Sequence, residues 1–141
     1  MTVIIIYLQK SPKKTIYLKY LFFREVKMPY LTVHCNAGLR NKNTAEFLNA
    51  ATELVAGELK KPKSYVVVEL DSNPGMAFGG NSTGRGALIE MKSVGFENKD
   101  SLARLLTEFV YDRFEGLDLK NINIWFVDMP HDDVSVGGRL L

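Results

Sequence analysis

The Met28-Pro29 pair is the feature of this 141-residue chain with the clearest chemical potential. Inside a chain, a proline nitrogen is an amide, which is not basic and donates no hydrogen bond. At a free N-terminus it is a secondary amine, and apolar surroundings or a nearby positive charge lower its pKa. Such an amine can take a proton from a carbon of a keto acid and return it elsewhere on the same molecule, as in keto–enol tautomerism. The alternative is that Pro29 only leads a strand, a common place for proline.

The other reactive side chains form no recognisable constellation. Cys35 is the single cysteine, so it can form no disulfide within the chain and falls far short of a metal site. We expect Cys35 to be a small apolar strand residue. His34 and His131 have no serine, cysteine or metal-ligand pattern beside them, and we expect both to be incidental. We therefore expect neither a cofactor nor a metal ion.

The elements that must position Pro29 begin directly after it. Residues 30–35 alternate between apolar and polar types, which is typical of a half-buried strand. Asn43 and Glu46 form a capping-box-like pair that opens a helix over residues 44–59. The apolar stripe of this helix consists of Leu48, Ala51, Val55 and Leu59. Residues 65–70 are apolar and rich in β-branched types, which predicts a buried strand.

A second half repeats this order. Residues 87–92 alternate like a strand, and Asn98 or Asp100 can cap the helix that follows. Residues 122–127 alternate again and complete the second unit. The apolar stripe of the second helix follows the i, i+3, i+4 spacing of an amphipathic helix and consists of Leu102, Leu105, Leu106, Phe109 and Val110.

Two strand–helix–strand units of similar length indicate an internal duplication and an α+β fold. Right-handed crossovers make the two strands of each unit parallel, which predicts a four-stranded mixed sheet with both helices on one face. The other face of this sheet is partly apolar and needs a cover. Association with further copies of the chain can provide that cover.

Charge divides the chain at Lys27. Residues 1–27 carry six Lys or Arg and one acid, whereas residues 28–141 carry 12 basic and 15 acidic side chains. A domain with a net charge of −3 lacks the basic stripe of a nucleic-acid-binding protein. Hydrophobic residues make up 46% of the chain and predict a packed core. We therefore divide the chain into a basic N-terminal extension, residues 1–27, and one domain, residues 28–141.

The N-terminal extension admits several explanations. Its apolar runs are short and interrupted by lysines, so it is a poor candidate for a membrane span. It also lacks the order of a secretory signal, in which the basic part comes first. An organellar presequence and a membrane-surface or partner-binding segment remain alternatives. The interpretation that we favour is that Met28 is the functional start.

Five short motifs in the domain, taken in order, resemble the macrophage migration inhibitory factor family, which includes D-dopachrome tautomerase. The Met-Pro start and the Met-Ala-Phe-Gly-Gly block are the specific pieces, and the resemblance covers nearly all of residues 29–141. The motifs are Met28-Pro29-Tyr30-Leu31, Lys61-Pro62, Met76-Ala77-Phe78-Gly79-Gly80-Asn81, Lys92-Ser93-Val94-Gly95 and Asp128-Met129.

This resemblance implies a homotrimer with active sites between subunits and a cofactor-free tautomerase acting on small aromatic keto or enol acids such as phenylpyruvate or dopachrome. Pro29 would be the catalytic base. Lys61 matches the family's active-site lysine, which can hold the substrate carboxylate or the enolate oxygen. A lysine at a helix C-terminus is also favoured by the helix dipole alone. Val94 matches the position whose backbone N–H meets the substrate carboxylate.

Departures from the family pattern keep a second function open. Where cytokine members place Tyr and Asn on the pocket side, this chain has Asn123 and Trp125. An aromatic pocket residue is replaced by Val136, and Gly86 and Ile89 stand where vertebrate members have a Cys-x-x-Cys motif. The alternative is a cytokine-like trimer that binds a cell-surface receptor and has a vestigial or blocked catalytic site. We expect a cytoplasmic protein that is also secreted without a signal peptide.

Overall fold

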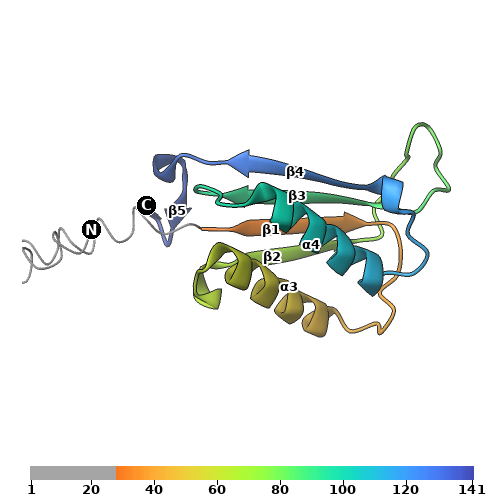
Figure 1. Cartoon of the computed structure of the whole chain (residues 1–141), viewed down its shortest axis with the longest axis horizontal. Helices are drawn as coiled ribbons and strands as arrows, with labels where there is room; N and C mark the ends of the chain where they lie inside the picture. The colour runs from red at the N-terminus through yellow and green to blue at the C-terminus, as the bar shows by residue number, and fades with distance from the viewer. Residues whose placement is uncertain (1–27) are drawn as a thin grey trace, which may run out of the picture.

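A four-stranded sheet with two helices on one face forms the body of the computed structural model, which describes residues 28–141 (Figure 1). The strand order is β2-β1-β3-β4, with β1 parallel to β2, β3 parallel to β4, and β1 antiparallel to β3. This arrangement confirms the two βαβ units and the mixed sheet expected from the sequence. The elements are β1 (Tyr30–Cys35), α3 (Thr44–Leu59), β2 (Val67–Ser72), β3 (Ala87–Ser93), α4 (Lys99–Arg113) and β4 (Ile122–Asp128).

Short elements complete the chain. A two-stranded hairpin follows β4 and lies beside the start of β1 (Figure 1). The backbone N–H of Leu141 donates to the Val134 carbonyl at 3.0 Å, which ties the last residue back to the hairpin's entry. Within residues 28–141, no helix is long and apolar enough to cross a membrane. The short elements are the 3₁₀ turns η1 (Lys63–Tyr65), η2 (Leu119–Asn121) and η3 (His131–Asp133), with β5 (Ser135–Val136) and β6 (Arg139–Leu140).

Side-chain caps start both helices where the sequence indicates. The Asn43 side chain accepts a hydrogen bond from the Glu46 N–H at 3.0 Å, and Asn98 accepts one from the Ser101 N–H at the same distance. Asn98 is therefore the cap of α4, and Asp100 lies in its first turn. Each cap satisfies one of the N–H groups that a helix start leaves without a partner in the helix.

The core lies between the helices and one face of the sheet. It takes the alternating residues of β1 and β3 and the apolar stripes of both helices. Phe47 was not part of the expected stripe of α3, yet it is fully buried and its ring centroid lies 5.4 Å from that of Phe114. Cys35 is fully buried in this core, as expected, and burial raises the pKa of its thiol. Cys35 is therefore packed as a small apolar residue rather than exposed as a nucleophile.

The expectation of a buried strand over residues 65–70 is wrong in extent and in burial. Tyr65 belongs to the 3₁₀ turn η1, and β2 begins only at Val67. The strand lies at the edge of the sheet, each of its residues is exposed or half-buried, and 51% of Val67 is exposed. β-branched side chains fit any pleated, half-buried surface, so they indicate a strand without showing whether it lies at the centre or the edge of the sheet.

The sheet face opposite the helices carries a polar cluster around His34. Its Nδ1 lies 2.8 Å from the Asp71 carboxylate on β2, and its Nε2 lies 3.2 Å from the Glu90 carboxylate on β3. The hydrogen bond to Asp71 raises the pKa of His34, with a smaller contribution from Glu90, and burial opposes both. His34 is thus not incidental to the sheet. In the part of the chain that the structure describes, no group of His, Cys, Asp and Glu is arranged to hold a metal ion.

The raised pKa of His34 predicts a pH-dependent contribution to stability. Because the folded state binds the proton more tightly than the unfolded state, the contribution is complete below the unfolded pKa of about 6.5 and is lost as pH rises through the folded pKa. We expect His34→Gln to lower the free energy of unfolding at pH 5.5 by up to about 1 kcal/mol, as for partly exposed ion pairs. At pH 8.5 the cost should be smaller. Urea unfolding at both pH values measures the difference, and an equal or larger cost at pH 8.5 would contradict it.

Candidate functional site

Pro29 is held rigidly at the start of the central strand. Its carbonyl oxygen accepts a hydrogen bond from the Val67 N–H at 3.0 Å, which joins the start of β1 to the start of β2. Less than 2% of the residue is exposed. Its nitrogen is bonded to the carbonyl of Met28, so in this chain it is an amide with no lone pair for a proton.

An apolar cluster, separate from the main core, includes both chain neighbours of Pro29. Met28, Val134 and Leu141 are its buried members, with exposed fractions of 6%, 4% and 6%. We refer to it as the Met28 cluster. The hairpin after β4 brings Val134 and Leu141 to the start of β1 (Figure 1). The half-buried residues that pack against it are Tyr30, Tyr65, Val94 and Met129. The surroundings that would disfavour a protonated amine at Pro29 are therefore present.

Lys61 lies at the same end of the sheet as Pro29. Helix α3 ends at Leu59, and Lys60 takes a left-handed conformation with φ of 54°. This turn directs the Lys61 N–H to the Ala56 carbonyl at 2.9 Å. The turn η1 then leads directly to Val67, the residue bonded to the Pro29 carbonyl. Lys61 is half-buried, and it enters this region through the end of a helix rather than from a free loop.

Val94 reaches the Met28 cluster from the end of β3. It follows the last residue of that strand and packs against the cluster. The next residue, Gly95, has φ of 84°, and its N–H donates to the Asp128 carboxylate at 2.9 Å. This bond fixes the backbone beside Val94. The structure thus gathers Pro29, Lys61 and Val94 at one end of the sheet.

Asn123 and Trp125 do not join this group within one protomer. Both lie on β4, which is separated from β1 by β3, so about 10 Å of sheet lies between them and β1. Trp125 pairs in register with Glu90 on β3 and is 54% exposed. Val136, in the hairpin, is 48% exposed and is not part of the Met28 cluster.

Three residues at this site could not be selected from the sequence. Val134 and Leu141 lie in a stretch without periodicity, and only the return of the hairpin brings them to Pro29. The sequence suggests only a start residue at Met28, whereas the Met28 side chain is buried in the cluster. The signal that the sequence does contain is the Gly137-Gly138 pair, which favours a tight hairpin turn.

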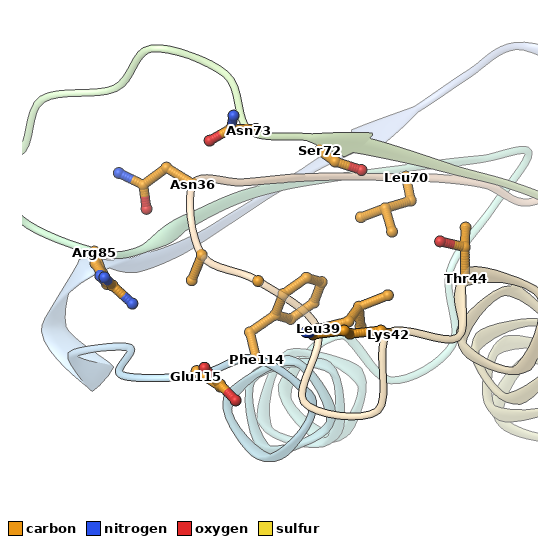
Figure 2. Close-up of a pocket in the computed structure, with 12 residues that line it drawn as sticks. Asn36, Leu39, Lys42, Thr44, Leu70, Ser72, Asn73, Arg85, Phe114 and Glu115 are labelled. Carbon is orange, nitrogen blue, oxygen red and sulfur yellow. The ribbon is translucent and has the colours of Figure 1, made fainter.

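A hollow of ≈ 390 Å³ lies at the other end of the sheet (Figure 2). It is lined by residues at the ends of β1 and β2 and beside the start of α3, so it lies roughly the length of β1, about 20 Å, from Pro29. Asn36 and Arg85 lie on one side of the view and Lys42 and Thr44 on the other (Figure 2). None of the residues predicted to do chemistry lines this hollow.

The Met-Ala-Phe-Gly-Gly block has a structural role, because its two glycines form a tight turn. Phe78 and Asn81 exchange two backbone hydrogen bonds of 3.0 Å around Gly79 and Gly80. Both glycines have positive φ, at 59° and 84°, as a tight hairpin turn requires. Phe78 packs against Gly86, where an added Cβ would lie 2.5 Å from the ring and 2.4 Å from the Asn121 carbonyl oxygen. A cysteine therefore has no room at this position.

Fold and site together define a duplicated βαβ protein with a proline at the head of its central strand, and comparison with known proteins identifies the family. The family model "Macrophage migration inhibitory factor (MIF)" matches residues 28–141. A macrophage migration inhibitory factor homolog of Trichuris trichiura is 34% identical over 113 residues, which cover 79% of this chain and 97% of that protein. A homolog of Trichinella spiralis is 30% identical over 115 residues, with the same two coverages.

Solved structures agree with the sequence comparisons. The structure of the factor from Trichinella spiralis has a TM-score of 0.68 at 25% identity, and the match covers 79% of this chain and 99% of that one. A homologue from Prochlorococcus marinus has a TM-score of 0.71 at 21% identity over 79% of this chain and 97% of that one, which shows the shared fold. This chain belongs to the macrophage migration inhibitory factor family. The resemblance recognised in the sequence is therefore confirmed, whereas the roles of individual site residues stay predictions.

The crowding at Gly86 predicts a large cost for the smallest side chain. We expect Gly86→Ala to lower the free energy of unfolding by about 1–3 kcal/mol, the usual size for overpacking, because the Asn121 backbone must move. Gly75→Ala is the matched control, since an added Cβ there meets nothing within 4 Å. Chemical unfolding of both variants measures the contrast. Equal stability of the two variants would show that the η2–β4 segment yields easily.

Proposed function

We propose that a form of this chain beginning at Pro29 is a cofactor-free keto–enol tautomerase of small aromatic keto acids such as phenylpyruvate or dopachrome. The observation that carries the proposal is the burial of Pro29 beside an apolar cluster, at the sheet end where the Lys61 and Val94 segments converge. Family membership supports an isomerase of this general type.

The chemistry requires removal of residues 1–28 for two reasons. Cleavage after Met28 converts the amide nitrogen of Pro29 into a secondary amine. It also removes the Met28 side chain, which fills the apolar cluster that an aromatic substrate would otherwise enter. The amine then takes the proton from the carbon next to the carbonyl and, as an ammonium, returns it to the enolate oxygen. In the reverse direction it carries the enol proton back to that carbon.

Lys61 and the backbone at Val94 bind the acidic end of the substrate in this mechanism. The ammonium of Lys61 stabilises the carboxylate or the negative charge that develops on the enolate oxygen. It also disfavours protonation of the nearby amine by charge repulsion. The Val94 N–H donates to the carboxylate, so its apolar side chain is free to pack in the cluster.

A homotrimer completes the site in this proposal. Asn123 and Trp125 lie too far from Pro29 within one protomer to touch the same substrate. In a closed trimer, β4 of one subunit can reach the Pro29 end of another, which supplies these side chains. The exposed Trp125 and Leu88 on the open face support such a contact.

The enzyme hypothesis predicts activity only in a chain whose first residue is Pro29. A fusion cleaved directly before Pro29, with the new terminus verified by intact mass, should tautomerise phenylpyruvate. Pro29→Gly should lower kcat/KM by about 100-fold or more, the range for loss of a general base. Lys61→Ala should raise KM, whereas Lys60→Ala, one residue away and exposed, should not. A full-length chain that still carries residues 1–28 and is equally active would rule out this mechanism.

A second candidate is a receptor-binding trimer with a blocked site, secreted without a signal peptide. Two observations favour it. The Met28 side chain is buried in its cluster, and the Met28 carbonyl acylates the Pro29 nitrogen. Trp125, at an altered pocket position, is exposed. Under this hypothesis the natural protein retains residues 1–28. Mass spectrometry of protein from its own cells, with receptor binding of Pro29→Gly, tests it. A natural terminus at Pro29, together with lost binding in the variant, would exclude it.

A further inference from the structure

Ser93 carries a buried hydroxyl group that nothing in the folded chain explains. The residue is fully buried, yet its Oγ has no hydrogen-bond partner among the residues that the structure describes. A buried polar atom without a partner is costly and uncommon. Its own backbone is engaged, because the Ser93 carbonyl accepts a hydrogen bond from the Met129 N–H at 2.9 Å. The side chain, however, is left without one.

The register of the sheet places this hydroxyl beside Pro29. On the antiparallel pair β1–β3, Leu31 lies opposite Met91 and Tyr30 opposite Lys92, so the next pair outward joins Pro29 with Ser93. Leu31 and Met91 both face the helices, and Pro29 and Ser93 follow them on that face by the two-residue period of strands.

The type of pairing brings the two side chains close together. The Pro29 carbonyl points toward β2, where it accepts the Val67 N–H. Pro29 and Ser93 therefore form a pair without mutual hydrogen bonds. In antiparallel sheets such pairs have the shorter separation, with Cα atoms about 4.5 Å apart and side chains in close proximity. An amide nitrogen at Pro29 offers the hydroxyl neither a donor nor an acceptor, which accounts for its lack of a partner.

We propose that Ser93 is a positioning residue for the catalytic amine: once Pro29 is the first residue, the Ser93 Oγ accepts a hydrogen bond from the Pro29 N–H. A neutral secondary amine has one N–H and one lone pair. Engaging the N–H with Ser93 aims the lone pair away from Ser93, toward the Met28 cluster that the substrate enters. This inference rests on the proposed function for its catalytic consequence, but the hydrogen bond itself is independent of activity.

The same bond has a defined effect on titration. The Ser93 oxygen accepts more strongly from a charged amine than from a neutral one, so losing it should lower the pKa of the Pro29 amine. Other titratable groups at this end of the sheet are the same in every variant below. They are Tyr30 on β1, Lys61 and Tyr65 before β2, Lys92 on β3, Asp128 on β4, His131, Asp132 and Asp133 in η3, and Arg139 on β6.

The test uses proteins that begin at Pro29, verified by intact mass and labelled with ¹⁵N-proline. Only Pro29 has an amine nitrogen among the prolines of this form, so its signal can be titrated directly. We expect Ser93→Ala to lower its pKa by about one unit and to lower kcat/KM for phenylpyruvate about tenfold. Ser93→Thr keeps the hydroxyl and should restore both. The exposed Ser82→Ala is the matched control and should change neither.

The outcomes distinguish a failure of the Ser93 hydrogen bond from a failure of the proposed tautomerase function. An unchanged Pro29 pKa in Ser93→Ala would overturn the role of Ser93, whatever the activity. A shifted pKa in a protein without tautomerase activity would support the hydrogen bond and refute the proposed enzyme. In the full-length chain, where Pro29 is an amide, Ser93→Ala should be no less stable than the parent protein. A marked loss of stability there would mean that the hydroxyl already has a partner, and would also overturn the proposal.

Discussion

The hydrogen bond between the Val67 N–H and the Pro29 carbonyl determines the geometry of this end of the molecule. It aligns the start of the central strand with β2, and this orientation sets which face of Pro29 meets β3. The positions of Ser93, Val94 and the connection that carries Lys61 follow from this register. A proline that leads a strand therefore has a fixed direction for its ring, whichever chemical form its nitrogen takes.

Much of the fold could be predicted because helices and alternating strands leave periodic patterns in a sequence. The stripes of α3 and α4, their asparagine caps and the order of the two βαβ units all follow from local spacing. The burial of β2 could not be predicted in this way. Its apolar residues look the same in a central strand as at an edge, and only the strand order shows that β2 lies at the edge.

The candidate site divides in the same way. Short motifs contain Pro29, Lys61 and Val94, so residue types and order were enough to select these residues. The structure brings all three to one end of the sheet. Val134 and Leu141 carry no motif, because a generic apolar side chain is recruited by the path of the chain rather than by its chemistry. The partners of His34 and the isolation of the Ser93 hydroxyl depend on cross-strand register, which a single sequence does not encode locally.

The close packing around Gly86 has an evolutionary consequence. Phe78 could become smaller to admit a side chain at this position, but the Asn121 carbonyl belongs to the backbone and no substitution there removes it. A lineage with this packing can therefore acquire a thiol at position 86 only after the segment that leads into β4 has shifted. A two-cysteine motif here requires coordinated changes at separate points of the chain, so single mutations toward it would be selected against one by one.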